Sequence, residues 1–70
     1  MTVEVFKTNV DHEAPASRLV ALLQMLFPGS RVNFDLEDHD RVLRVEGVNV
    51  CCEKIVNLLK NEGYQCHILI

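Results

Sequence analysis

The chain has 70 residues, of which 49% are hydrophobic and 24% are charged, and its formal net charge at pH 7 is -3. This length fits a single domain covering residues 1–70, and the composition excludes a disordered chain. The acidic balance argues against nucleic acids and anionic membrane surfaces as partners.

The cysteines and the N-terminal segment bear on the compartment in which the protein works. The three cysteines are an odd number without the spacing of a disulfide framework, which favours a reducing environment. Glu4 and Lys7 stand where a signal peptide would have its apolar run, so we expect no such peptide. The longest apolar stretch, residues 19–27, is interrupted by Gln24 and is too short to cross a bilayer. We therefore expect a cytoplasmic protein without a membrane partner.

The N-terminal half predicts a strand followed by a helix. Residues 3–10 are rich in β-branched side chains and include Phe6, which is typical of a strand. A polar segment ends in Pro15, which suits the first turn of a helix over residues 16–27. The helix ends at Pro28 and Gly29. Its apolar face follows the i, i+3, i+4, i+7 pattern and consists of Leu19, Leu22, Leu23 and Leu26.

The C-terminal half predicts a hairpin, a second helix and a last strand. Apolar and polar residues alternate over 32–36 and again over 43–46, with a polar turn between them. Asn49 is a suitable N-cap for a helix that carries Ile55 and Leu59 on its apolar face. We expect Gly63 to end that helix in the left-handed conformation, before a final strand over residues 66–70.

The order of elements is therefore β-α-β-β-α-β. Two right-handed crossovers in this order give an α+β, ferredoxin-like fold with an antiparallel sheet of strand order 4-1-3-2. Both helices are expected on one face of the sheet. The other face is left for water or for a partner.

Several separated segments carry a family resemblance. They are Pro28-Gly29, Val32-Asn33-Phe34-Asp35-Leu36-Glu37, Leu43-Arg44-Val45-Glu46-Gly47 and Glu62-Gly63-Tyr64. Together with the order of elements, they resemble the heavy-metal-associated domain found in small copper chaperones and in metal-transporting ATPases. The resemblance runs the whole chain and implies the same ferredoxin-like scaffold.

The metal motif of that family does not match. The family presents Met-x-Cys-x-x-Cys in the loop after the first strand, and its thiolates suit monovalent copper and zinc. Here the two cysteine positions fall at His12 and Pro15, or at Glu13 and Ala16, so the family's ligands cannot be carried over. One alternative is a changed ligand set for zinc or a similar divalent ion, with His12, Glu13 and His39 as candidates at one end of the sheet. The competing interpretation is a solvated polar end.

The cysteines themselves favour core packing. Cys51 and Cys52 are adjacent on a helix and point about 100° apart, which makes a poor chelate. Cys52 shares the apolar face of its helix, and Cys66 has the parity of the apolar residues of the last strand. We expect Cys66 to lie too far from Cys51 to share a metal or a disulfide. An exposed, reactive Cys51 at a helix N-terminus is the functional alternative.

The uncovered face of the sheet is the candidate interaction surface. If Val3 and Val5 face the helices, Phe6 lies on the opposite face. Val42 and Leu69 join it there, and Arg44 lies beside them, so the predicted surface residues are Phe6, Val42, Arg44 and Leu69. An apolar patch with a charged border is typical of a contact surface, and the two edge strands offer strand addition as a second route.

These observations favour a small non-enzymatic binding or interaction module that forms a homo-oligomer or binds a protein partner. Nothing in the chain resembles a nucleophile elbow or a phosphate-binding glycine loop, so catalysis has no support. No cofactor is expected. The alternative is a metal-binding or metal-transport protein with histidine and carboxylate ligands. A sensor of small molecules ranks last, because it rests on fold analogy alone.

Overall fold

The computed structural model describes residues 1–69 and contains the six elements in the predicted order. The last residue of the predicted final strand, Ile70, lies outside the described residues. The elements are β1 (Thr2–Thr8), α1 (Glu13–Leu26), β2 (Arg31–Asp35), β3 (Val42–Gly47), α2 (Cys52–Asn61) and β4 (Cys66–Ile68).

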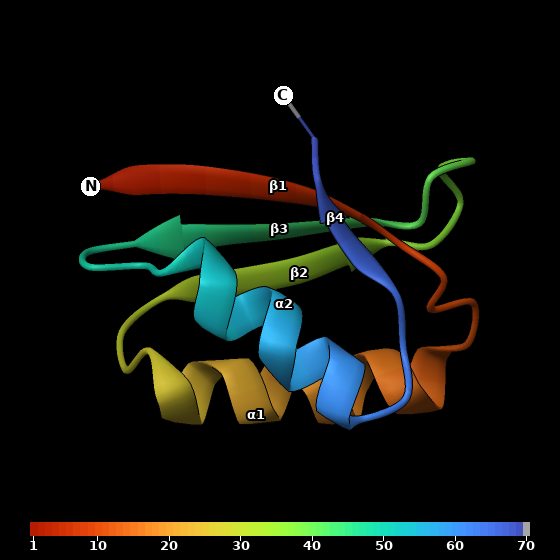
Figure 1. Cartoon of the computed structure of the whole chain (residues 1–70), viewed down its shortest axis with the longest axis horizontal. Helices are drawn as coiled ribbons and strands as arrows, with labels where there is room; N and C mark the ends of the chain where they lie inside the picture. Colours follow the sequence, from red (N-terminus) through yellow and green to blue (C-terminus); the bar gives the residue numbers. More distant parts are fainter. Residues whose placement is uncertain (70) are drawn as a thin grey trace.

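The four strands form one antiparallel sheet of order β2-β3-β1-β4. This is the predicted order read from the opposite edge, so the α+β ferredoxin-like fold is confirmed. Figure 1 shows both helices below the sheet and no element above it. The sheet therefore has one face covered by helices and one uncovered face.

The core lies between the sheet and the two helices. Leu19 and Leu23 from α1 and Ile55 and Leu59 from α2 are fully buried, as their helical spacing predicts. The other predicted apolar positions of α1 are less buried, and Leu26 is 40% exposed. The remaining buried apolar side chains come mainly from the sheet and its flanking loops: Phe6, Val10, Val32, Leu43, Val45 and Cys66.

The predicted orientation of β1 is wrong. Phe6 is 0% exposed and belongs to the core, not to the uncovered face. The register explains this, because Phe6 lies directly opposite Leu43 on β3 and Ile68 on β4, and residues opposite one another share a face. The side chains of Val3 and Val5 consequently point to the uncovered face. A large aromatic ring on a central strand fills the space between both helices better than valine does.

Two helix starts differ from prediction. Helix α1 begins at Glu13, so Pro15 lies inside its first turn, where a missing N–H still costs no hydrogen bond. Helix α2 has Cys51 as its N-cap residue, and Asn49 is not the cap. Asn49 instead has a φ of 60°, a left-handed conformation that asparagine tolerates in turns.

The end of α2 follows prediction. Gly63 has a φ of +94°, and its N–H donates to the carbonyl of Lys60 at 3.0 Å. The N–H of Tyr64 donates to the carbonyl of Leu59 at 2.9 Å. These two bonds satisfy carbonyl groups that the helix leaves free and direct the chain into β4.

Replacing Phe6 tests the orientation of β1. We expect Phe6→Ala to lower the free energy of unfolding by about 3–5 kcal/mol, because it leaves a cavity between sheet and helices. Val3→Thr, at a position 43% exposed on the same strand, should change the free energy by less than about 0.5 kcal/mol. Urea unfolding followed by circular dichroism measures both. Equal losses in the two variants would contradict the register.

Candidate interaction surface

The register of the sheet defines which side chains occupy the uncovered face. Lys7 lies opposite His67, Val5 opposite Arg44, and Val3 opposite Glu46. The N–H of Leu69 donates to the carbonyl of Val5 at 2.8 Å, which extends the same pairing one residue past β4. We call this surface the open face; its apolar residues are Val3, Val5, Val42 and Leu69, and its charged residues are Lys7, Arg31, Asp35, Arg44 and Glu46.

The apolar residues of the open face cross three adjacent strands. Leu69 is 37% exposed, and Val5 and Val42 are half-buried. Of the residues predicted for the interaction surface, Val42, Arg44 and Leu69 lie on this face, and Phe6 does not. Val3 and Val5 lie there in its place, because β1 has the opposite orientation to the predicted one.

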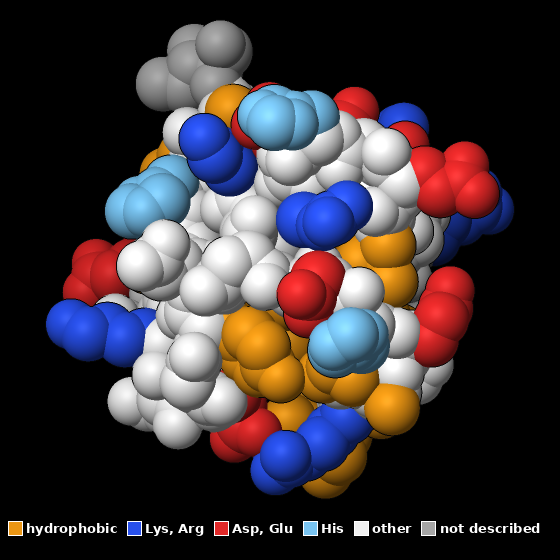
Figure 2. All heavy atoms as spheres, turned by 90° about the vertical axis from the view of Figure 1, so that its right-hand side faces the viewer, with side chains coloured by type: hydrophobic (Ala, Val, Ile, Leu, Met, Phe, Trp, Pro, Cys, Tyr) orange, Lys and Arg blue, Asp and Glu red, His pale blue; other side chains and the backbone are white. Residues whose placement is uncertain are grey.

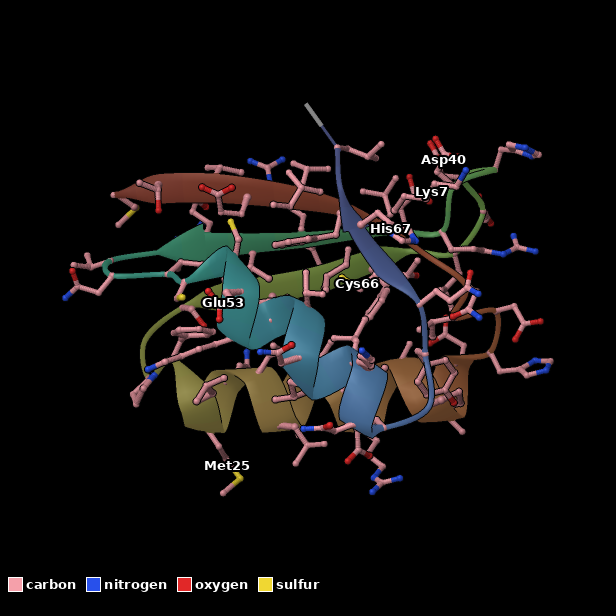
Figure 3. All side chains as sticks on the ribbon, viewed as in Figure 1. Lys7, Met25, Asp40, Glu53, Cys66 and His67 are labelled. Atoms are coloured by element: carbon pink, nitrogen blue, oxygen red, sulfur yellow. The ribbon has the colours of Figure 1, made fainter. Side chains whose placement is uncertain are left out.

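The charges of the open face have both signs. Arg31 lies opposite Glu46, and Asp35 lies opposite Val42 on the same pair of strands. At one corner the ammonium group of Lys7 lies 3.6 Å from a carboxylate oxygen of Asp40. Figure 3 shows Lys7, Asp40 and His67 together at this corner, beside the hairpin between β2 and β3. A surface with mixed charges can match a second copy of itself.

Hydrogen bonds fix the hairpin that borders this corner. The hydroxyl of Thr8 donates to the carbonyl of Arg41 at 2.6 Å and accepts the N–H of Val10 at 3.2 Å. The guanidinium of Arg41 donates to the carbonyl of Leu36 at 2.7 Å. These contacts join the end of β1 to the hairpin, so the edge of the open face is held in place.

The candidate metal ligands are exposed and dispersed. His12 and Glu13 lie at the start of α1, and His39 lies in the hairpin turn. The nearest charged atom to the His12 ring is a carboxylate oxygen of the adjacent Asp11, 3.5 Å from Nε2. Figure 2 views this end of the molecule and shows the histidines as separate patches. Within residues 1–69 no three histidine, cysteine or acidic side chains form a group able to hold a metal ion. A metal site formed by His12, Glu13 and His39 is a prediction from the sequence alone.

All three cysteines are free thiols. Cys66 is buried, as predicted, and its sulfur lies between the sheet and α2 in Figure 3. Burial, with a smaller contribution from Cys52, raises the pKa of the Cys66 thiol to about 11.

Glu4 has a role that the sequence does not reveal. It lies opposite the buried Val45, so its side chain points to the helix side of the sheet although it is charged. There the Glu4 carboxylate, together with burial, raises the pKa of the Cys52 thiol to about 11. A negative group is stabilised near the N-terminus of a helix, which is where Cys52 lies. The pair is chemically unreactive at neutral pH, because very little thiolate forms.

No family model, no curated protein and no solved structure matches the chain. No helix in the described part of the chain is long and apolar enough to cross a membrane.

Removing the charge of Glu4 tests its effect on Cys52. In a Cys51→Ser background, we expect Glu4→Gln to lower the pKa of Cys52 and to speed its alkylation by iodoacetamide several-fold at neutral pH. The thiolate fraction grows faster than its intrinsic nucleophilicity falls. Mass spectrometry of timed samples measures the rate. Glu46→Gln on the open face is the matched control and should leave the rate unchanged. Equal rates in both variants would exclude contact between Glu4 and Cys52.

Proposed function

We propose that the protein is a small non-enzymatic interaction module that pairs with a second copy of itself through the open face. The observation that carries this proposal is the composition of that face. A central apolar group, including Val5 and Val42 on the two inner strands, is bordered by both cations and carboxylates.

Such a surface suits a two-fold axis. In an isologous contact the same patch meets itself, so each cation needs a carboxylate elsewhere on the patch. Arg44 and Arg31 can meet Asp35 and Glu46 of the other copy, and the apolar residues then lie at the centre. A face carrying charge of one sign would repel its copy, and this face avoids that.

The size of the open face sets the expected strength of pairing. Strands spaced about 4.8 Å apart and about 20 Å long give a four-stranded face of roughly 400 Å². A standard interface buries about 800 Å² per partner, so we expect a reversible dimer that dissociates in the micromolar range or above. Pairing would also add buried apolar area to a domain whose own core is small.

We propose further that the chain has the scaffold of a heavy-metal-associated domain but lacks the thiolate metal site of that family. The β-α-β-β-α-β order and the segments from Pro28 to Tyr64 support the relationship. Neither position that corresponds to the family's paired cysteines can supply a thiolate. Three free thiols are compatible with a reducing, cytoplasmic setting.

Charge placed on the open face tests self-association. We expect sedimentation equilibrium of the wild-type chain to show a monomer–dimer equilibrium below about 1 mM, as a small interface implies. Leu69→Lys should weaken the dimer about tenfold or more, because it puts a charge beside Val5 in the apolar group of the open face. Leu69 follows the last strand and is 37% exposed, so the fold should tolerate the change.

Val48→Lys is the matched control. Val48 is 67% exposed in the loop after β3, outside the open face, so this variant should dimerise like the wild type. A wild-type chain that stays monomeric over the whole concentration range would overturn the proposal. So would equal weakening by both lysine substitutions.

A further inference from the structure

A groove of about 490 Å³ runs between α1 and the edge strand β2, and its border includes Asp35 of the open face. Ala16, Ser17 and Val20 line it from the helix, and Val32 and Phe34 line it from the strand. Figure 1 shows β2 lying directly above α1 along this side of the molecule. Phe34 and Val20 are only half-buried, so the groove presents apolar surface to solvent.

The backbone of β2 bordering the groove has free hydrogen-bonding groups. The bond from Leu69 to Val5 shows that the odd residues of β1 direct their N–H and C=O groups toward β4, so the even residues bond to β3. The same alternation applies across β3, so the N–H and C=O groups of Asn33 bond to Arg44. The N–H and C=O groups of Val32 and Phe34 then point away from β3, toward the outer edge of the sheet. Nothing in residues 1–69 pairs with that outer edge of the sheet.

The charge around the groove has one sign. Glu13 at the start of α1 and Asp35 and Glu37 at the end of β2 belong to its lining, and no lysine or arginine does. Within the described chain none of these three carboxylates forms an ion pair. The groove therefore combines an apolar floor, a free strand edge and an uncompensated acidic border.

We propose that this groove binds an extended, basic peptide segment of a protein partner, which adds to the sheet as a strand beside β2. Backbone bonds to Val32 and Phe34 would supply affinity, as in other cases of strand addition. Alternate side chains of the peptide would enter the groove beside Phe34 and Val20, so these should be apolar. The intervening side chains would lie on the side of Asp35, so these should be lysine or arginine.

The acidic border of the groove favours a basic peptide over a second copy of the chain. A copy carries a net charge of -3 and would bring another Glu13 and another Glu37 to the same edge. The groove also has an internal comparison, because the other edge of the sheet has a hollow lined by Lys60, Cys66 and His67 and by no carboxylate. A basic peptide should avoid that second hollow. Peptide binding at β2 and pairing through the open face both involve Asp35, so each is measured by itself.

The test uses ¹⁵N-labelled full chain and a capped heptapeptide that alternates lysine with valine. We expect saturable shifts at the amides of Val20, Val32 and Phe34, and no shift at His67. Amide exchange with solvent should slow at Val32 and Phe34 on binding, whereas Asn33 should be protected with or without peptide. A peptide of the same sequence methylated on alternate backbone nitrogens should bind at least about tenfold more weakly if the free edge supplies the bonds.

Charge reversal completes the experiment. The double variant Asp35→Lys, Glu37→Lys should lose about tenfold or more in affinity at physiological salt, because the lysines of the peptide lie on the side of Asp35. Glu53→Lys is the matched control, since Glu53 is an exposed glutamate on α2 outside the groove (Figure 3), and it should lose less than about twofold.

Three results would overturn the inference. One is the absence of saturable binding by the peptide. Another is an equal loss of affinity in the Glu53→Lys control, which would mean attraction to net charge alone. The third is protection of Val32 and Phe34 that grows with protein concentration without peptide, which would identify a second copy as the occupant. A monomeric chain that binds the peptide would sustain this inference while contradicting self-association.

Discussion

The pairing of Phe6 with Leu43 and Ile68 is the constraint on which the rest of this structure depends. Side chains alternate along a strand, so fixing one residue on the helix side fixes every other residue of β1. With Phe6 buried, β1 presents Val3, Val5 and Lys7 to the opposite side. The open face, and the function proposed for it, are direct consequences of this register.

The same register has a cost that the structure offsets locally. It turns the charged Glu4 toward the helices, where a carboxylate would be unfavourable in an apolar environment. Glu4 instead lies near Cys52, the first residue of α2. The raised pKa of Cys52 results from this proximity. It also leaves little Cys52 thiolate at neutral pH.

Much of the fold could be predicted from the sequence because its signals are long and periodic. The leucines of α1, the alternation around Phe34 and Leu43, and Gly63 at the end of α2 each specify a local structure that is observed. The orientation of β1 could not be predicted, because apolar residues occur at both parities of that strand. The N-cap of α2 was misassigned because Asn49 suits a left-handed turn as well as it suits a cap.

The candidate site was less predictable than the fold for a related reason. Val42, Arg44 and Leu69 were placed correctly by their parity on β3 and β4, whereas Val3 and Val5 were assigned to the wrong side with β1. The groove beside β2 leaves no pattern in the sequence at all, since it depends on how far α1 stands from the edge strand. Ligand candidates such as His12 and His39 sit on separate loops, and no spacing along the chain could bring them together.

In the proposed dimer, the apolar group of the open face meets the same group of another copy. Isotope-filtered NOE spectroscopy on a mixture of ¹³C-labelled and unlabelled protein tests it most directly, because it records only contacts between copies. We expect cross-subunit NOEs at the methyl groups of Val5, Val42 and Leu69 at concentrations where the dimer is populated. Cross-subunit NOEs confined to Phe34 and Val20, or none at any concentration, would contradict it.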